Sequence, residues 1–130
     1  MKAVVLEEPG AADQLHYKDL PDPVATPGHV VVRVRACAVA QRDLIERRGG
    51  HPFLRTPIVQ GHEFAGEIVE IGEGVTRWRC GDRVVCLYTD SCGTCEACTR
   101  GEERRCANAR EAYGLTVDGG YAEFALVHER

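Results

Sequence analysis

Four cysteines that lie close together in the sequence could bind one metal ion. Residues 92–98 read CGTCEAC, and a fourth cysteine follows after seven intervening residues. A C-x2-C-x2-C spacing with a further thiol nearby can place four thiolates around one point, which is the arrangement of a structural zinc site. Four thiolates leave no coordination position for a substrate, so the zinc would be structural. The predicted ligands are Cys92, Cys95, Cys98 and Cys106.

Two disulfide bonds are the alternative use of these four thiols. The first ten residues, MKAVVLEEPG, form a short apolar stretch that leads into acidic residues and does not resemble a cleavable signal. No apolar run approaches the length that spans a membrane. We therefore expect a reducing, cytoplasmic location, where clustered cysteines usually bind metal or take part in redox chemistry.

Composition excludes several classes of partner. The chain has 130 residues, with 44% hydrophobic and 28% charged residues, which is ordinary for one globular domain. A formal net charge of −4 gives no general attraction for nucleic acid or for an anionic membrane. A zinc ribbon that binds nucleic acid is also disfavoured because no aromatic residues are interleaved with a basic groove. The three remaining cysteines, Cys37, Cys80 and Cys86, are expected to be small buried hydrophobic residues.

Short strands and frequent glycine or proline turns are expected to position these residues. In residues 30–39, Val32 and Val34 share one face with Val30, whereas Arg33 and Arg35 share the other face with Val31. Such alternation favours an antiparallel sheet with one wet face. Gly66, inside a long β segment, indicates a bulge or a close approach of two backbones. The expected strands are 2–7, 14–20, 30–39, 62–71, 83–88 and 121–128, with one or two helical turns at 43–48.

Many short strands and little helix favour a closed or nearly closed all-β barrel. No G-x-G-x-x-G sequence follows an expected strand, because residues 72–74 read GEG but Arg77 stands where the last glycine should fall. A Rossmann cofactor domain is therefore expected to be absent, and residues 1–130 are expected to form one domain.

Several short motifs occur in a specific order along the chain. Residues 61–72 read GHEFAGEIVEIG, residues 81–84 read GDRV, and residues 118–123 read DGGYAE, with the four cysteines between the last two. In this combination the chain resembles the N-terminal catalytic domain of the zinc-containing alcohol dehydrogenases, in the medium-chain dehydrogenase/reductase superfamily. The resemblance covers essentially the whole chain. It implies a mainly β, GroES-like barrel with a zinc-binding loop lobe and short helices.

The resemblance also implies a catalytic site. In that family the catalytic zinc is bound by a cysteine, by the histidine of G-H-E and by a third ligand farther along the chain, and an aspartate supports the histidine. Carried over, these residues are His62, the adjacent Glu63 and the supporting Asp43. The cysteine is replaced by Ala40, and Cys37 lies on the opposite strand face.

This chain thus supplies at most His62 and Glu63 as ligands of a catalytic zinc. A catalytic zinc needs three protein ligands and one open position. We therefore hypothesise that this second zinc site is empty or only partly occupied. The alternative role of His62 and Glu63 is as a hydrogen-bonded polar pair with Asp43 in the cleft of the barrel.

Arg42 stands where the family has a hydroxyl residue that relays a proton from alcohol. Such an arginine recurs in members that resemble acryloyl-CoA reductases, which reduce an activated carbon–carbon double bond with NADPH. The planar guanidinium would suit a phosphorylated or acyl-CoA substrate.

Two functions from different classes remain. In the first, the chain is the substrate-side, zinc-binding domain of an NAD(P)-dependent alcohol dehydrogenase or enoyl-type reductase. It would act on a small-molecule alcohol, aldehyde or enoyl substrate, and it would be inactive without a cofactor domain because hydride transfer requires a bound nicotinamide. In the second, the chain is a stand-alone, zinc-stabilised barrel that binds a partner or forms a homo-oligomer through an exposed apolar patch.

Overall fold

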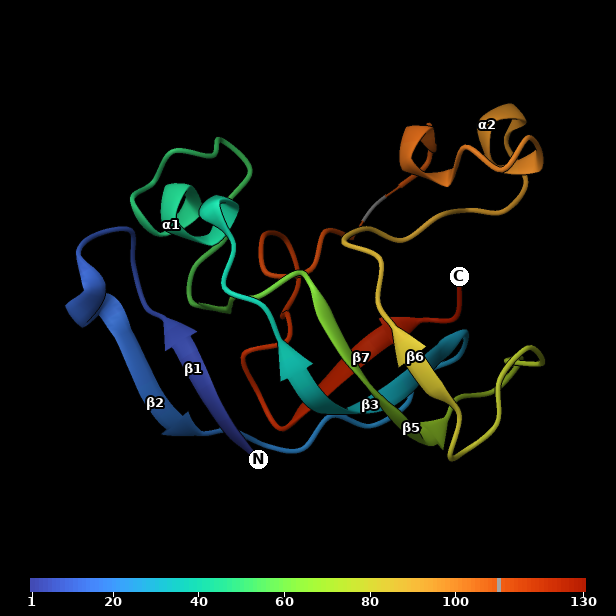
Figure 1. Ribbon diagram of the computed structural model, residues 1–130, viewed down its shortest axis with the longest axis horizontal. Coiled ribbons are helices and arrows are strands. Elements are labelled where there is room, and N and C mark those ends of the chain that lie inside the picture. Colours follow the sequence, from blue (N-terminus) through green and yellow to red (C-terminus); the bar gives the residue numbers. More distant parts are fainter. Residues whose placement is uncertain (110) are drawn as a thin grey trace.

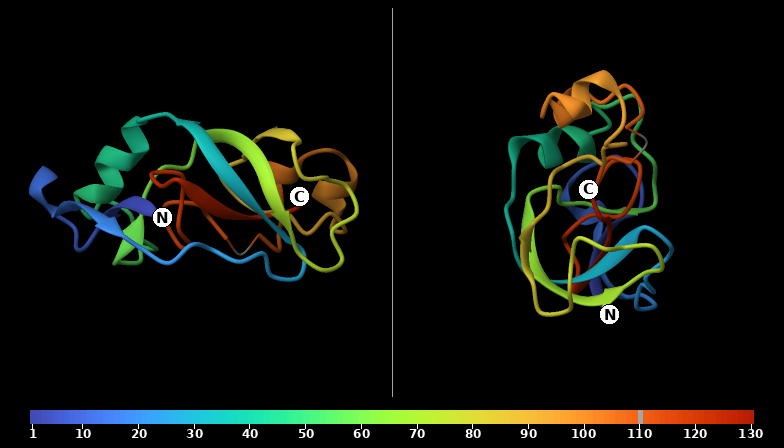
Figure 2. Two further views of the ribbon diagram at one scale, coloured as in Figure 1. Left: turned by 90° about the horizontal axis from the view of Figure 1, so that it is seen from below. Right: turned by 90° about the vertical axis from the view of Figure 1, so that its right-hand side faces the viewer.

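The strands form two antiparallel sheets that lie at opposite ends of the molecule (Figures 1 and 2). The computed structural model describes residues 1–109 and 111–130. The smaller sheet has the order β2-β1-β4 and contains β1 (Lys2–Leu6), β2 (Leu15–Asp19) and β4 (Ile58–Val59). The larger sheet has the order β6-β5-β3-β7 and contains β3 (His29–Cys37), β5 (Phe64–Ile71), β6 (Arg83–Val85) and β7 (Phe124–His128).

Helices are short and few among the described residues. They are α1 (Gln41–Arg47), α2 (Glu96–Thr99) and the 3₁₀ turns Ala12–Gln14 and Glu103–Arg105. The predicted mainly β fold is therefore confirmed, with strand ends within a few residues of those expected. Four short elements were not predicted, namely β4, α2 and the two 3₁₀ turns. All are shorter than the window over which apolar periodicity can be recognised.

Residues 119–123 join the two sheets. Tyr121 and Glu123 exchange backbone hydrogen bonds with β1, through Val4 N to Tyr121 O and Glu123 N to Lys2 O. Residues 119–121 also donate to the end of β4, where Gly119 N reaches Val59 O at 2.7 Å, and to the two residues after it. The sheets are thus connected by loop backbone. A closed or nearly closed barrel was expected, and the described strands do not form a closed one.

The main hydrophobic core lies on the larger sheet. It contains Phe64, Ile68 and Val32, all almost completely buried, together with Tyr113. Trp78 is partly buried and packs against this cluster. A smaller cluster of Ala3, Val5 and Val59 lies on the other sheet.

The central strand β3 follows the predicted alternation only in part. Val32 is buried and Arg33 and Arg35 are exposed, as expected, but Val31 is buried on the face that was predicted to be wet. The start of β3 is therefore covered on both faces. At Gly66 an added Cβ would lie 2.2 Å from the carbonyl oxygen of Arg33, and the β3–β5 register shifts beside it. The predicted close backbone approach is confirmed.

The cysteines outside the four-cysteine group differ in burial. Cys86 is buried in the main core as expected, whereas Cys37 is only half-buried and packs against that core. Cys80 is exposed, so the prediction of a buried thiol is wrong there. It lies in the turn before Gly81, outside both sheets, where no apolar layer can cover it. Within the described part of the chain, no helix is long and apolar enough to cross a membrane.

Candidate functional site

The four cysteine sulfurs lie around a single point. They belong to a lobe, residues 92–106, that is reached from the end of β6 and stands apart from both sheets (Figure 1). The ligand atoms of Cys92, Cys95, Cys98 and Cys106 all lie within 4.8 Å of one another. Individual sulfur–sulfur distances are 3.5 Å for Cys95–Cys98 and 3.9 Å for both Cys92–Cys98 and Cys95–Cys106.

These distances agree with tetrahedral zinc. Four sulfurs each about 2.3 Å from one tetrahedral ion lie about 3.8 Å from one another. A disulfide would bring two sulfurs to about 2.05 Å, and all four thiols are free. The cluster could therefore hold one structural zinc, and its geometry does not support the disulfide alternative.

Backbone amides of the lobe and the side chain of Asn108, just after it, donate hydrogen bonds to the sulfurs. The amides of Cys92 and Cys95 reach Cys106 Sγ and Cys92 Sγ, each at 3.3 Å, and Asn108 donates its side-chain amide to Cys92 Sγ at 3.5 Å. Several hydrogen bonds lower the pKa of Cys92 to about 5, and the bond from the Asn108 side chain has the largest effect. Burial, followed by the hydrogen bond with Cys95, raises the pKa of Cys98 to about 12. Donors of this kind orient and stabilise metal-bound thiolates.

A second candidate site is a cleft of about 780 Å³ on one side of the larger sheet. Its polar lining residues are Arg42, His62 and Glu63. The apolar part of the lining includes Val85 and Leu87, both exposed, from β6 and the segment after it. A largely apolar cleft with a few polar groups at one end is typical of a small-molecule site.

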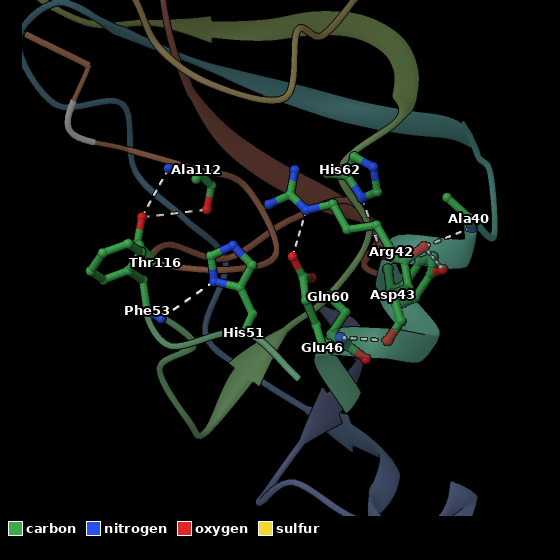
Figure 3. Close-up of polar contacts among 11 residues, drawn as sticks. Ala40, Arg42, Asp43, Glu46, His51, Phe53, Gln60, His62, Ala112 and Thr116 are labelled. Carbon is green, nitrogen blue, oxygen red and sulfur yellow. Dashed lines mark hydrogen bonds and ion pairs between the residues drawn. The ribbon is translucent and has the colours of Figure 1, made fainter. Parts of the chain in front are cut away.

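The imidazole of His62 is fixed by a buried carboxylate. His62, just before β5, places Nδ1 3.1 Å from Asp43 Oδ1 in α1 (Figure 3). Asp43, whose exposed fraction is 3%, also accepts hydrogen bonds at Oδ2 from the Ala40 amide at 2.8 Å and the Tyr121 hydroxyl at 2.9 Å. An Nδ1–H donated to Asp43 leaves the lone pair of Nε2 on the other side of the ring.

Tyr121 is itself affected by this arrangement. Burial, followed by the hydrogen bond to Asp43, raises its pKa above the ordinary value for tyrosine. The phenol therefore stays protonated and remains a donor to the carboxylate over the physiological pH range.

Arg42 lies beside His62 at the same end of the cleft. Its Nε forms an ion pair with Oε1 of Glu46, one helical turn further along α1 (Figure 3). Its guanidinium carbon lies 5.5 Å from the centre of the Tyr88 ring, within the range of a cation–π contact. The side chain is thus held between a carboxylate and an aromatic face.

The donors at this end of the cleft do not fit a second zinc. Position 40 is an alanine without a ligand atom, and Glu63 is exposed. Across residues 1–109 and 111–130, the four lobe cysteines are the single group of three or more His, Cys, Asp or Glu residues close enough to share an ion. Cys37 belongs to no such group, and burial, with the charges of Asp43 and Glu63, raises its pKa to about 11.

One family of known proteins matches most of this chain. The family described as the alcohol dehydrogenase GroES-like domain matches residues 26–130. This chain belongs to that family. The predicted resemblance is thereby confirmed, and so is the predicted GroES-like, mainly β domain.

Relatives of this GroES-like domain are considerably longer. The chain is 41% identical over 127 residues to an acryloyl-coenzyme A reductase of Metallosphaera sedula, covering 98% of this chain and 37% of the relative. The structure of an NAD-dependent alcohol dehydrogenase matches with a TM-score of 0.87 and 36% identity. The match covers 99% of this chain and 38% of the dehydrogenase chain. The cobalt- and zinc-bound thermostable alcohol dehydrogenase of Pyrobaculum aerophilum matches with a TM-score of 0.90 and 33% identity, covering 98% and 39%. This chain thus spans a little more than a third of the length of the curated relatives it matches.

The structure brings some of the predicted site residues of the GroES-like domain together and adds two others. The structure brings His62 and Asp43 together, places Glu63 at the cleft, and gathers the four cysteines elsewhere. Glu46 and Tyr121 were missed. The i, i+4 spacing from Arg42 to Glu46 is a signal that could have indicated the ion pair, whereas nothing local links Tyr121 to a carboxylate 78 positions away.

Proposed function

We propose that this chain is the substrate-side domain of an NAD(P)-dependent oxidoreductase that acts on a small-molecule alcohol, aldehyde or enoyl compound. The observation that carries the proposal is the apolar cleft that ends in His62, fixed by Asp43, with Arg42 beside it. Family membership and the printed activities of the relatives support it. Hydride transfer requires a nicotinamide held against the substrate, so residues 1–130 by themselves are expected to bind zinc but not to catalyse the reaction.

The test is an activity assay on the gene product as its native cell makes it. Purified protein is offered crotonyl thioester, a set of primary and secondary alcohols, and the corresponding aldehydes, each with both nicotinamides. Turnover of one class with NAD(H) or NADP(H) is the expected result. Absence of turnover with every substrate and both nicotinamides would refute the oxidoreductase proposal.

We further propose that one structural zinc is bound by Cys92, Cys95, Cys98 and Cys106. The zinc site in the His62 cleft is proposed to be empty or only partly occupied. The expected metal content of purified protein is therefore about one zinc per chain, because four thiolates complete a tetrahedral site and the cleft lacks a third donor. Elemental analysis by mass spectrometry measures this directly. Two zinc ions per chain would contradict the proposal for the cleft.

A second candidate function is a binding or self-association module. It is favoured by exposed apolar residues around the cleft, above all Val85, which is 84% exposed at an edge strand. Such a patch can mark a docking surface. Sedimentation of residues 1–130 distinguishes the two functions, because a concentration-dependent dimer without nicotinamide-linked activity in the native gene product would favour the module. A reducing, cytoplasmic location and the absence of a nucleic-acid partner are parts of the first proposal.

A further inference from the structure

Helix α1 holds the guanidinium of Arg42 in one position at the polar end of the cleft through an ion pair with Glu46. The Glu46 side chain is 0% exposed, and that of Arg42 is 26% exposed, so the ion pair is anchored on its carboxylate side. Oε1 of Glu46 receives Nε of Arg42, and no described residue forms a hydrogen bond with Oε2. A fully buried carboxylate is costly unless it is paired. Glu46 therefore strongly favours the conformation in which Arg42 stays against it.

The remaining donors of Arg42 are directed elsewhere. The ion pair uses Nε, and the hydrogen bonds of the described residues include none from the two terminal nitrogens. In Figure 3 these nitrogens form the tip of the side chain, and the aliphatic stem of Arg42 lies between them and His62. Tyr88 restrains the group from a further direction. Arg42 is the one Lys or Arg among the residues that are described as lining the cleft.

The surrounding charges decide what kind of ligand this cation accepts. Three carboxylates lie around the same end of the cleft, those of Asp43, Glu46 and Glu63. A phosphate or carboxylate ligand would meet this excess of negative charge. A neutral carbonyl oxygen avoids that repulsion and still accepts charge-assisted hydrogen bonds from the guanidinium. The arrangement therefore favours a carbonyl group over an anion.

We propose that Arg42 binds the carbonyl oxygen of an α,β-unsaturated carbonyl substrate and stabilises the negative charge that this oxygen gains, and that Glu46 positions Arg42 for this task. The inference rests on the proposed oxidoreductase function and names its substrate class.

The chemistry gives the cation a role during the reaction. A hydride from the reduced nicotinamide adds to the β carbon, the electrons of the carbon–carbon π bond form the enolate, and its oxygen becomes negative. A proton from water then adds to the α carbon and restores the carbonyl group. A preorganised donor aimed at the oxygen stabilises this developing charge, which a catalytic metal would otherwise do. The cleft lacks the donors for such a metal.

Kinetics on the native gene product test the inference. With crotonyl thioester, Arg42→Gln is expected to lower kcat about 100- to 1000-fold with little change in KM, because the interaction forms fully only as charge develops. Arg42→Lys restores part of the rate, since lysine keeps the charge but loses the planar fork. Glu46→Gln should lower kcat about tenfold at unchanged zinc content. Arg48→Gln, an exposed arginine at the end of the same helix, is the matched control and should leave kcat unchanged.

A binding experiment on residues 1–130 gives a readout without turnover. The ¹⁵N signals of the Arg42 side chain are followed by NMR while crotonamide, crotonate or inorganic phosphate is added. Crotonamide is expected to shift them more than either anion does at equal concentration, and Glu46→Gln should reduce that shift. A larger response to phosphate or crotonate would overturn the choice of a carbonyl group, and full kcat in Arg42→Gln would overturn the catalytic role. If no nicotinamide-linked activity exists, the proposed function fails, and the NMR comparison alone decides what Arg42 binds.

Discussion

Removing zinc with a chelator is expected to unfold the cysteine lobe, residues 92–106, while the two sheets stay folded. The lobe contains one four-residue helix, one 3₁₀ turn and a single buried cysteine, Cys98. It has almost no apolar core of its own, so the metal supplies most of its stability. The sheets have separate hydrophobic clusters that contain no cysteine of the lobe.

Trypsin measures this opening. Three exposed arginines of the lobe, Arg100, Arg104 and Arg105, are cleavage sites. Free zinc at about 1,000 times its dissociation constant stabilises the bound form by about 4 kcal/mol, so cleavage there should accelerate about a thousandfold after chelation. The Cys98→Ser variant should be cleaved rapidly with or without zinc. The Cys80→Ser variant, which changes an exposed cysteine outside the lobe, should be cleaved like the wild type.

Two results would contradict the zinc assignment. One is a tryptic pattern that does not change when the chelator is added. The other is opening of the lobe by a reducing agent in the absence of chelator, which would indicate disulfide bonds in place of a metal site.

Asp43→Ala is expected to lower the free energy of unfolding by about 3–5 kcal/mol, because three buried donors lose their acceptor and each unsatisfied group costs about 1–3 kcal/mol. Three donors converge on this carboxylate, namely the Ala40 amide, the Tyr121 hydroxyl and His62 Nδ1. Alanine would leave all three without their acceptor in a buried site, and each unsatisfied group is costly. Urea unfolding of the wild type and the variant measures the difference.

Two further variants bracket this effect. Tyr121→Phe removes one of the three donors and should cost about 1 kcal/mol. Asp13→Ala changes an exposed acid in the first 3₁₀ turn and should stay within about 0.5 kcal/mol of the wild type. If Asp43→Ala costs no more than Tyr121→Phe, Asp43 does not organise this end of the cleft.

The two candidate sites of the domain are physically separate and use different chemistry. The lobe is a closed set of four soft thiol ligands without an open position. The cleft presents an imidazole, a guanidinium and an exposed carboxylate to an open apolar space. Stability and reactivity can therefore be altered independently, and Cys98→Ser and Arg42→Gln should affect different measurements.

The sequence alone determined the features that depend on neighbouring residues. All four cysteines fall within fifteen positions, so their spacing was enough to predict the cluster that the structure contains. The alternation in residues 32–35 and the glycine turns gave the mainly β fold for the same reason, since a strand face is set by local geometry. The pairing of His62 with Asp43 came from ordered motifs that resemble a known family.

Only the tertiary structure decided how distant segments meet. It showed two sheets joined through residues 119–123, with β4 too short to be recognised in the sequence. It showed that Cys80 is exposed. It also showed that the Tyr121 hydroxyl donates to Asp43 and that Glu46 forms an ion pair with Arg42. Burial and long-range contacts arise from the packing of elements far apart in the chain, and a pattern that repeats every two to four residues carries no information about such packing.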